Sequence, residues 1–202
     1  MRIASRAVGL GVGLAVCLTV LSARAATVDL TEARTAPGSD QATLYLVNSL
    51  SVAVGGVQLV VTGAAGFSFN FAGSNLSSLD SSYEVQPIPG LDLLNALAPA
   101  DVALAGPGQS VLLGTFSLPS GASPLPDLIP LDTVTGVPST ILDVVGNPFS
   151  ATQYETIECA PDFGNCPITL RVTVAPEPSG LALGLAAFAL FAVIWRREER
   201  SP

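Results

Sequence analysis

Residues 168–174, ITLRVTV, decide the fold class of this chain. Apolar side chains occupy every second position, and Thr, Arg and Thr lie between them. Successive side chains of a strand point to opposite faces, so this alternation predicts a half-buried β-strand with one face on a core. Residues 57–62 (VQLVVT) and 67–71 (FSFNF) show the same pattern. The sequence therefore predicts an all-β domain.

Further strands are expected on both sides of these stretches. They are residues 27–33, 41–47, 82–86, 110–118 and 140–145, separated by turns rich in Gly and Pro. Many short strands with such turns are typical of a sandwich, so we expect a single antiparallel β-sandwich over residues 26–174. Residues 90–104 are the candidate for a helical turn, with Asp92 as its cap and Pro99 at its end.

Residues 119–130 contain four prolines. Proline cannot donate a hydrogen bond to a sheet, so we expect a loop or an extended edge segment there. A proline-rich ligand for another domain is the alternative interpretation of this composition.

The N-terminus has the pattern of a secretory signal peptide. Arg2 and Arg6 precede a short apolar run, and Ala23 and Ala25 place small side chains where a signal peptidase reads them. Residues 1–25 are therefore predicted to be a cleaved signal helix. A membrane anchor that stays attached is the alternative, which the short run and the A-x-A site disfavour.

Residues 175–202 form a second candidate targeting segment. The apolar stretch at about 180–195 would be roughly 24 Å long as a helix, which barely spans a bilayer. Arg196 and Arg197 follow it and favour the cytoplasmic side of a membrane. These features predict a single transmembrane helix with the bulk of the chain outside.

The same segment resembles the PEP-CTERM sorting signal. Pro176, Glu177 and Pro178 are followed by the apolar stretch and then by the arginines, all at the chain end. The resemblance implies a transient inner-membrane anchor and cleavage near Pro-Glu-Pro by an exosortase-type membrane protease. It also implies a Gram-negative bacterium that makes an extracellular polysaccharide matrix, with the protein finally on the cell surface or in that matrix.

Composition excludes several classes of site. The whole chain has no His and no Lys, which excludes a His general base, a His-ligated zinc and a Lys Schiff base. Residues 26–178 hold two arginines against fourteen acidic residues, a net charge of −12. Such a charge repels nucleic acid and anionic lipid, so we expect no nucleic-acid partner.

Cys159 and Cys166 flank a turn-forming insert and predict a disulfide in an oxidising compartment. A zinc site lacks enough ligands, and a redox-active pair lacks the C-x-x-C spacing. We expect no cofactor, although acids in or near loops would permit Ca²⁺ without the spacing of a known Ca²⁺ loop. The candidates are Asp127, Asp132, Asp143 and Asp162.

The order of elements in the middle of the chain is similar to a cohesin-type module. The similarity includes Val28-Asp29-Leu30, the turn at 36–39, the strand entry at 54–59 and residues 108–118. It implies a nine-stranded, jelly-roll-like sandwich that serves for binding. Residues 62–66, TGAAG, depart from the family's Tyr-Asp-Pro turn, so its partner-binding residues do not transfer to this chain.

Together these features predict an exported, non-catalytic binding or adhesion module, with signal peptidase and an exosortase as processing partners. Its ligand would be a surface protein or an exopolysaccharide. The alternative is a small secreted glycan-active enzyme that uses a carboxylate pair, because two carboxylates suffice for that chemistry. A Ca²⁺-stabilised structural domain is the third hypothesis.

Overall fold

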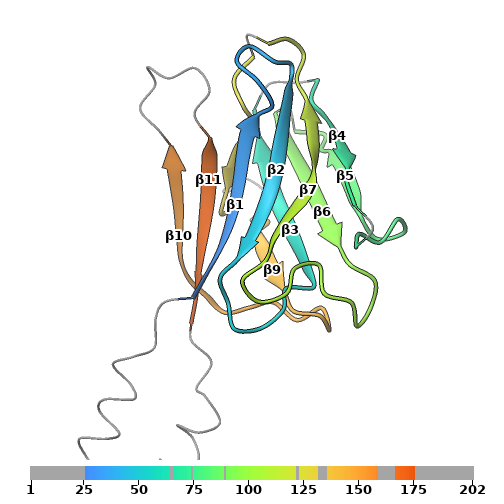
Figure 1. The fold of residues 1–202 in the computed structure, drawn as a ribbon. Helices are drawn as coiled ribbons and strands as arrows, with labels where there is room; N and C mark the ends of the chain where they lie inside the picture. The colour runs from blue at the N-terminus through green and yellow to red at the C-terminus, as the bar shows by residue number, and fades with distance from the viewer. Residues whose placement is uncertain are drawn as a thin grey trace, which may run out of the picture. The chain divides into compact units, whose positions relative to one another are not determined.

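The computed structural model describes residues 26–63, 66–73, 75–88, 90–121, 123–131, 136–158 and 167–175. Residues Ala26–Ala175 form one compact unit. Its described residues contain eleven strands in two antiparallel sheets and no helix (Figure 1). The prediction of an all-β domain of antiparallel strands is therefore confirmed. None of the described residues belongs to a helix that could cross a membrane.

The larger sheet has six strands in the order β10-β11-β1-β2-β7-β4. Their bounds are β10 Ala151–Glu158, β11 Ile168–Val174, β1 Ala26–Arg34, β2 Gln41–Asn48, β7 Ser110–Ser117 and β4 Ser68–Phe71. The first and last long strands meet directly, since β1 pairs with β11 from Ala26↔Val174 to Glu32↔Ile168. Both ends of the compact unit therefore lie side by side at one end of this sheet.

The smaller sheet has five strands centred on β3. Their bounds are β5 Ser82–Val85, β6 Leu91–Leu97, β3 Gly56–Thr62, β8 Asp127–Ile129 and β9 Thr140–Leu142. Both β8 and β9 pair with the same edge of β3, one with each half of it. Ser139 lies at the junction: its hydroxyl accepts from the Val60 N–H at 2.9 Å and donates to the Ile129 carbonyl at 2.5 Å.

The core lies between the two sheets, which Figure 1 shows one behind the other. Alternate residues of each strand enter it, including Val28 and Leu30 from β1 and Leu59 and Val61 from β3. Aromatic rings join the layers, since Phe116 of β7 lies edge-on to Tyr83 of β5 with centroids 6.0 Å apart. This inward alternation is what the period-two pattern of the sequence predicted.

The expectations about local structure need four corrections. Residues 91–97 form strand β6 between β3 and β5, so the helical turn expected over 90–104 is wrong. Pairing on both sides overrides the helix preference of this leucine-rich stretch. Strand β10 was not expected, and the strand expected over 140–145 ends at Leu142. The described residues hold eleven strands, whereas the cohesin resemblance implies nine.

The two ends of the domain differ in what they carry. The terminal end is where β1 begins beside the end of β11, and where β3 begins at Gly56 opposite Leu97 and Leu142. The distal end is where β1 finishes at Arg34, whose guanidinium donates to the carbonyls of Ser39 and Ser123. Those two bonds tie the β1–β2 hairpin to the proline-rich segment before β8.

Candidate functional site

The outer face of the six-stranded sheet presents rows of hydroxyl groups. Because Val28 and Leu30 of β1 enter the core, Thr27, Asp29 and Thr31 between them point outward. Register then aligns neighbours on the same face. One row is Tyr45–Thr31–Thr169–Ile157, a second is Thr115–Thr43–Ala33, and a third is Thr27–Thr173–Gln153. We call the outer face that carries these three rows the hydroxyl face.

Some of these hydroxyls bond to one another or to the backbone, which fixes their positions. The Thr31 and Thr169 hydroxyl oxygens are 3.0 Å apart across the β1–β11 pair. The Thr43 hydroxyl donates to the Ala33 carbonyl at 3.2 Å. Tyr45 is 39% exposed, so part of its side chain is accessible on this face. A hydroxyl both donates and accepts, so each fixed group can also meet a partner's hydroxyl.

An ion pair between β1 and β11 lies on the same face, and its two charges cancel. The Arg171 guanidinium donates two hydrogen bonds to the Asp29 carboxylate, each 2.9 Å long. The hydrogen bond to Asp29 raises the pKa of Arg171 above its ordinary value. Glu155 lies beside Arg171 in the register, so the row Val47–Asp29–Arg171–Glu155 has a net charge of −1. The described strands of this face are thus nearly neutral in a strongly acidic domain.

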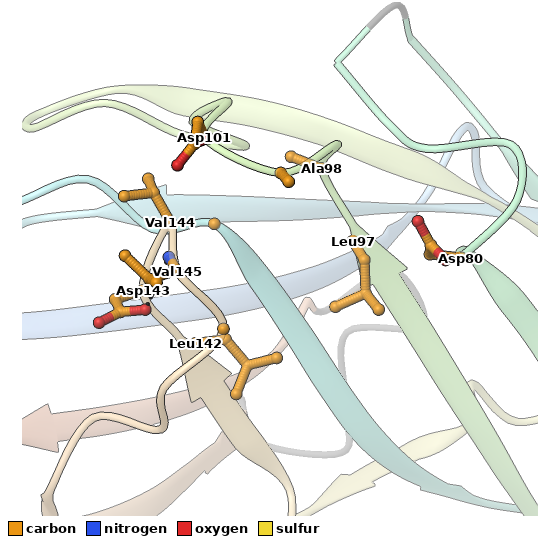
Figure 2. Close-up of a pocket in the computed structure, with 11 residues that line it drawn as sticks. Asp80, Leu97, Ala98, Asp101, Leu142, Asp143, Val144 and Val145 are labelled. Atoms are coloured by element: carbon orange, nitrogen blue, oxygen red, sulfur yellow. Dashed lines mark hydrogen bonds between the residues drawn. The ribbon is translucent and has the colours of Figure 1, made fainter.

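A cleft with a volume of about 400 Å³ opens at the terminal end of the domain (Figure 2). Its lining comes from the segments around the start of β3, the end of β6, the turn after β9 and the β4–β5 connection. The apolar lining includes Leu97, Ala98, Leu142, Val144 and Val145. The remaining lining includes Asp80, Asp101 and Asp143, which Figure 2 shows apart from one another around the opening.

Close packing of Gly55 shapes one wall of this cleft. A Cβ atom at Gly55 would lie 2.2 Å from the Asp143 carbonyl oxygen and 2.6 Å from the Val144 Cα. The Gly55 N–H donates to the Leu142 carbonyl, and its own carbonyl accepts from the Ala98 N–H, both at 2.9 Å. Only glycine permits this approach of the backbone, so the cleft depends on the residue at position 55.

Two of the three cleft carboxylates are already engaged. Asp143 accepts from the Asn147 and Val145 N–H groups at 2.8 and 2.9 Å and from the Asn147 side-chain amide at 3.2 Å. The Asn147 N–H is the main cause of a lowered pKa at Asp143, which keeps this group charged. Asp80 accepts from the Ser77 hydroxyl at 2.8 Å.

Glu32 is a carboxyl group inside the core near the distal end. Its side chain is fully buried, and neither oxygen has a hydrogen-bond partner among the described residues. Burial raises the pKa of Glu32 to about 9, with a further contribution from the negative charge of Asp127. The carboxyl is therefore protonated at neutral pH, because the ordinary pKa of a glutamate is about 4.3.

Asp92 faces the same interior from the opposite sheet. Its position in β6 is opposite Val61, a core residue, and its carboxylate accepts a hydrogen bond from the Tyr83 hydroxyl. Burial and this bond raise the pKa of Tyr83. Glu32 and Asp92 thus place one carboxyl group each on the inner side of the two sheets, and the full burial of Glu32 leaves it no contact with solvent.

The residues predicted from the sequence fall into two groups. Among the Ca²⁺ candidates, Asp127 begins β8 opposite Thr62, whereas Asp143 follows β9 near Gly56, at the other end of β3. The structure does not bring these two together, and its described residues contain no cluster of three metal-binding side chains. The other candidates lie outside the described residues. They are Ala23, Ala25, Asp132, Cys159, Asp162, Cys166, Pro176, Glu177, Pro178, Arg196 and Arg197.

Two features of the site were not found from the sequence. Glu32 occupies the inward position of the alternation Val28, Leu30, Glu32, which is a signal that could have marked it as buried. The cleft had no such signal, because its walls come from four separate segments.

Comparisons of the chain with protein-family models, with curated proteins and with solved structures found no match.

Proposed function

We propose that this chain is an exported, non-catalytic surface or matrix protein whose β-sandwich binds a neutral polysaccharide through the hydroxyl face. The observation that carries the proposal is the chemistry of that face: fixed Thr hydroxyls, an exposed Tyr45 ring and a net charge close to zero. Sugar hydroxyls exchange hydrogen bonds with such groups, and an aromatic ring packs on the apolar face of a sugar.

Charge supports a neutral rather than an anionic polysaccharide. The exported part has a net charge of −12, which repels a polyuronate or a sulfated chain over a distance of about a Debye length. The hydroxyl face adds little to that charge, because Asp29 and Arg171 cancel. A neutral chain therefore approaches this face without an electrostatic barrier.

Export and anchoring rest on the two terminal segments of the sequence. In this proposal signal peptidase removes residues 1–25, and residues 175–202 hold the protein in the inner membrane of a Gram-negative cell until an exosortase-type protease cuts near Pro176–Pro178. The compact unit Ala26–Ala175 supports the proposal, since its strands pair and its core closes within that range. We propose a jelly-roll-like, cohesin-like architecture for the sandwich on the resemblance of its sequence, with eleven described strands in place of nine.

Deletion of residues 176–202 tests the anchoring part. We expect the truncated protein to leave the membrane fraction and to keep the urea midpoint of the full chain, because no described strand or core residue is removed. Cell fractionation and urea unfolding followed by circular dichroism measure the two properties. Aggregation of the truncated protein would show that the deleted segment belongs to the fold.

Retention on immobilised polysaccharides tests the binding part. The full chain in detergent is passed over a neutral glucan, a neutral galactan and a polyuronate. We expect retention on at least one neutral matrix and none on the polyuronate at low salt. Retention on none of the three, or on the polyuronate alone, contradicts the proposal. Release of reducing sugar from a matrix would instead favour the glycan-active enzyme with a carboxylate pair.

A further inference from the structure

The cleft at the terminal end combines an apolar interior with negative charge at its opening. Leu97, Leu142, Val144 and Val145 supply apolar surface, and Val145 is 74% exposed. Asp80, Asp101 and Asp143 stand around this surface. A volume of about 400 Å³ accommodates one long side chain and its flanking backbone.

Among the three cleft carboxylates, Asp101 is the one that can accept hydrogen bonds from a ligand without losing others. It is exposed, and no hydrogen bond joins its carboxylate to another described residue in the contacts of this structure. Its backbone has φ 63°, a left-handed conformation that aspartate and asparagine tolerate better than most residues. Asp143 and Asp80, by contrast, are held by the bonds to Asn147, Val145 and Ser77 described above.

An arginine side chain matches this combination. Its methylene stem packs on apolar surface while its guanidinium remains at the edge in contact with carboxylates. A neutral sugar would gain little from the leucine and valine surface, which offers its hydroxyls no hydrogen bonds.

The domain's own cations do not fill the cleft. Within the described residues the arginines are Arg34 and Arg171. Arg34 is bonded to Ser39 and Ser123 at the distal end, and Arg171 is paired with Asp29 on the hydroxyl face. A second copy of this domain would therefore have to break one of these contacts to donate an arginine.

We propose that the cleft between Asp80, Asp101 and Asp143 binds an arginine side chain of another polypeptide. This site is distinct from the hydroxyl face, because it lies at the end of the domain and is formed mainly by the smaller sheet and its connections. It gives the protein a means to join a basic protein segment while the hydroxyl face is occupied. The inference does not depend on polysaccharide binding.

The test uses the full-length, ¹⁵N-labelled chain in detergent micelles and a blocked peptide, Gly-Ala-Arg-Ala-Gly. Its matched control replaces the arginine with citrulline, which has the same shape and no charge. We expect amide shifts at Asp101 and at residues 142–146, and binding of the citrulline peptide weaker by at least about fivefold. Equal binding of both peptides, or shifts confined to other segments, overturns the proposal.

A pair of variants separates a local site from general attraction to an acidic protein. Asp101→Asn removes one charge at the cleft and keeps a residue that tolerates the left-handed backbone. Asp40→Asn removes one charge from an exposed position at the distal end. We expect the first to weaken arginine-peptide binding by about three- to fivefold and the second to leave it unchanged. Equal losses would mean that net charge alone attracts the peptide. Spectra of the free variants establish that both are folded.

Discussion

Two fully buried polar side chains, Asn48 at the terminal end and Glu32 towards the distal end, have opposite surroundings. The Asn48 amide makes four hydrogen bonds, and neither carboxyl oxygen of Glu32 makes one to a described residue. The partners of Asn48 are the carbonyls of Val52, Ala105 and Gly106 and the N–H of Leu50. A satisfied buried amide holds chain segments together, whereas an unsatisfied carboxyl lowers stability.

The difference shows how the domain distributes its stability. At the terminal end Asn48 connects the β2–β3 segment to the stretch before β7, and the cleft lies beside this region of fixed loops. At the distal end the core contains the neutral carboxyl group of Glu32, which forms no hydrogen bond with a described residue. We therefore expect substitution of Asn48 and substitution of Glu32 to change stability in opposite directions.

The largest expected effect is at the terminal end. Asn48→Leu keeps a side chain of similar size but leaves the Val52 carbonyl and the Leu50 N–H without a partner, whereas the Ala105 and Gly106 carbonyls still accept from the Val54 and Gln109 N–H groups. We expect a loss of about 4 kcal/mol in the free energy of unfolding, at about 2 kcal/mol for each of the two groups left without a partner. Urea unfolding of the full chain measures it. Asn95→Leu is the control, since the Asn95 amide donates one bond, to Ser82; equal losses would show that the Asn48 network is not special.

The next effect is a gain at the distal end. Glu32→Leu removes the buried carboxyl, whose pKa of about 9 in the folded state exceeds its value in the unfolded chain. That difference predicts a stabilisation on the order of 3 kcal/mol at pH 7. A higher urea midpoint at pH 7 is the expected result. A lower midpoint would mean that Glu32 has a favourable interaction in the folded protein.

The same residue predicts a pH dependence with a definite sign. The folded state retains the Glu32 proton between about pH 4.5 and 9, and the unfolded state has lost it. The contribution of Glu32 to stability therefore decreases as pH rises through this window and levels off above about 9. Glu32→Gln should remove this slope, whereas Glu84→Gln, at an exposed position, should retain it. Parallel profiles for all three proteins would contradict the assignment.

A smaller effect compares glycines at the two ends. Gly55→Ala at the terminal end forces a Cβ against the Asp143 carbonyl, and we expect a loss of about 2 kcal/mol together with a changed cleft. Gly38→Ala at the distal end meets open space and has only the left-handed conformation, φ 70°, to oppose it. That strain is about 1 kcal/mol. A larger loss at Gly38 than at Gly55 would reverse the comparison.

The sequence predicted the strands whose two faces differ, and it failed where they do not. Residues 168–174 alternate cleanly and form β11 as expected. β6 has leucines on both faces, and its sequence favours a helical turn. β10 shows no apolar alternation, and its Thr156 is exposed although it lies opposite the core residue Leu170. Such strands are specified by the neighbours that cover them.

The candidate surfaces depend on strand order, which periodicity does not encode. The alternation in residues 27–33 and 168–174 predicts that their threonines are exposed to solvent. That these threonines share one face follows only from the strand order β11-β1-β2-β7. The cleft could not be predicted either, because four segments that are separate in the sequence form its walls. The signal peptide, the C-terminal sorting segment and the disulfide of Cys159 and Cys166 stay predictions, since they lie outside the described residues.

The smallest change in stability is expected for Tyr45→Ala, and this variant therefore allows the most direct test of the proposed function. Tyr45→Ala removes an exposed ring from the hydroxyl face, and we expect the free energy of unfolding to stay within about 0.5 kcal/mol. Titration calorimetry then gives the dissociation constant of the full chain for soluble fragments of the neutral polysaccharide that retains it. We predict a loss of about tenfold for Tyr45→Ala and about fivefold for Thr31→Val. Thr62→Val on the smaller sheet should bind as the wild type does. Unchanged affinity in both face variants, or the absence of any neutral polysaccharide that binds, would contradict the proposed role of the hydroxyl face.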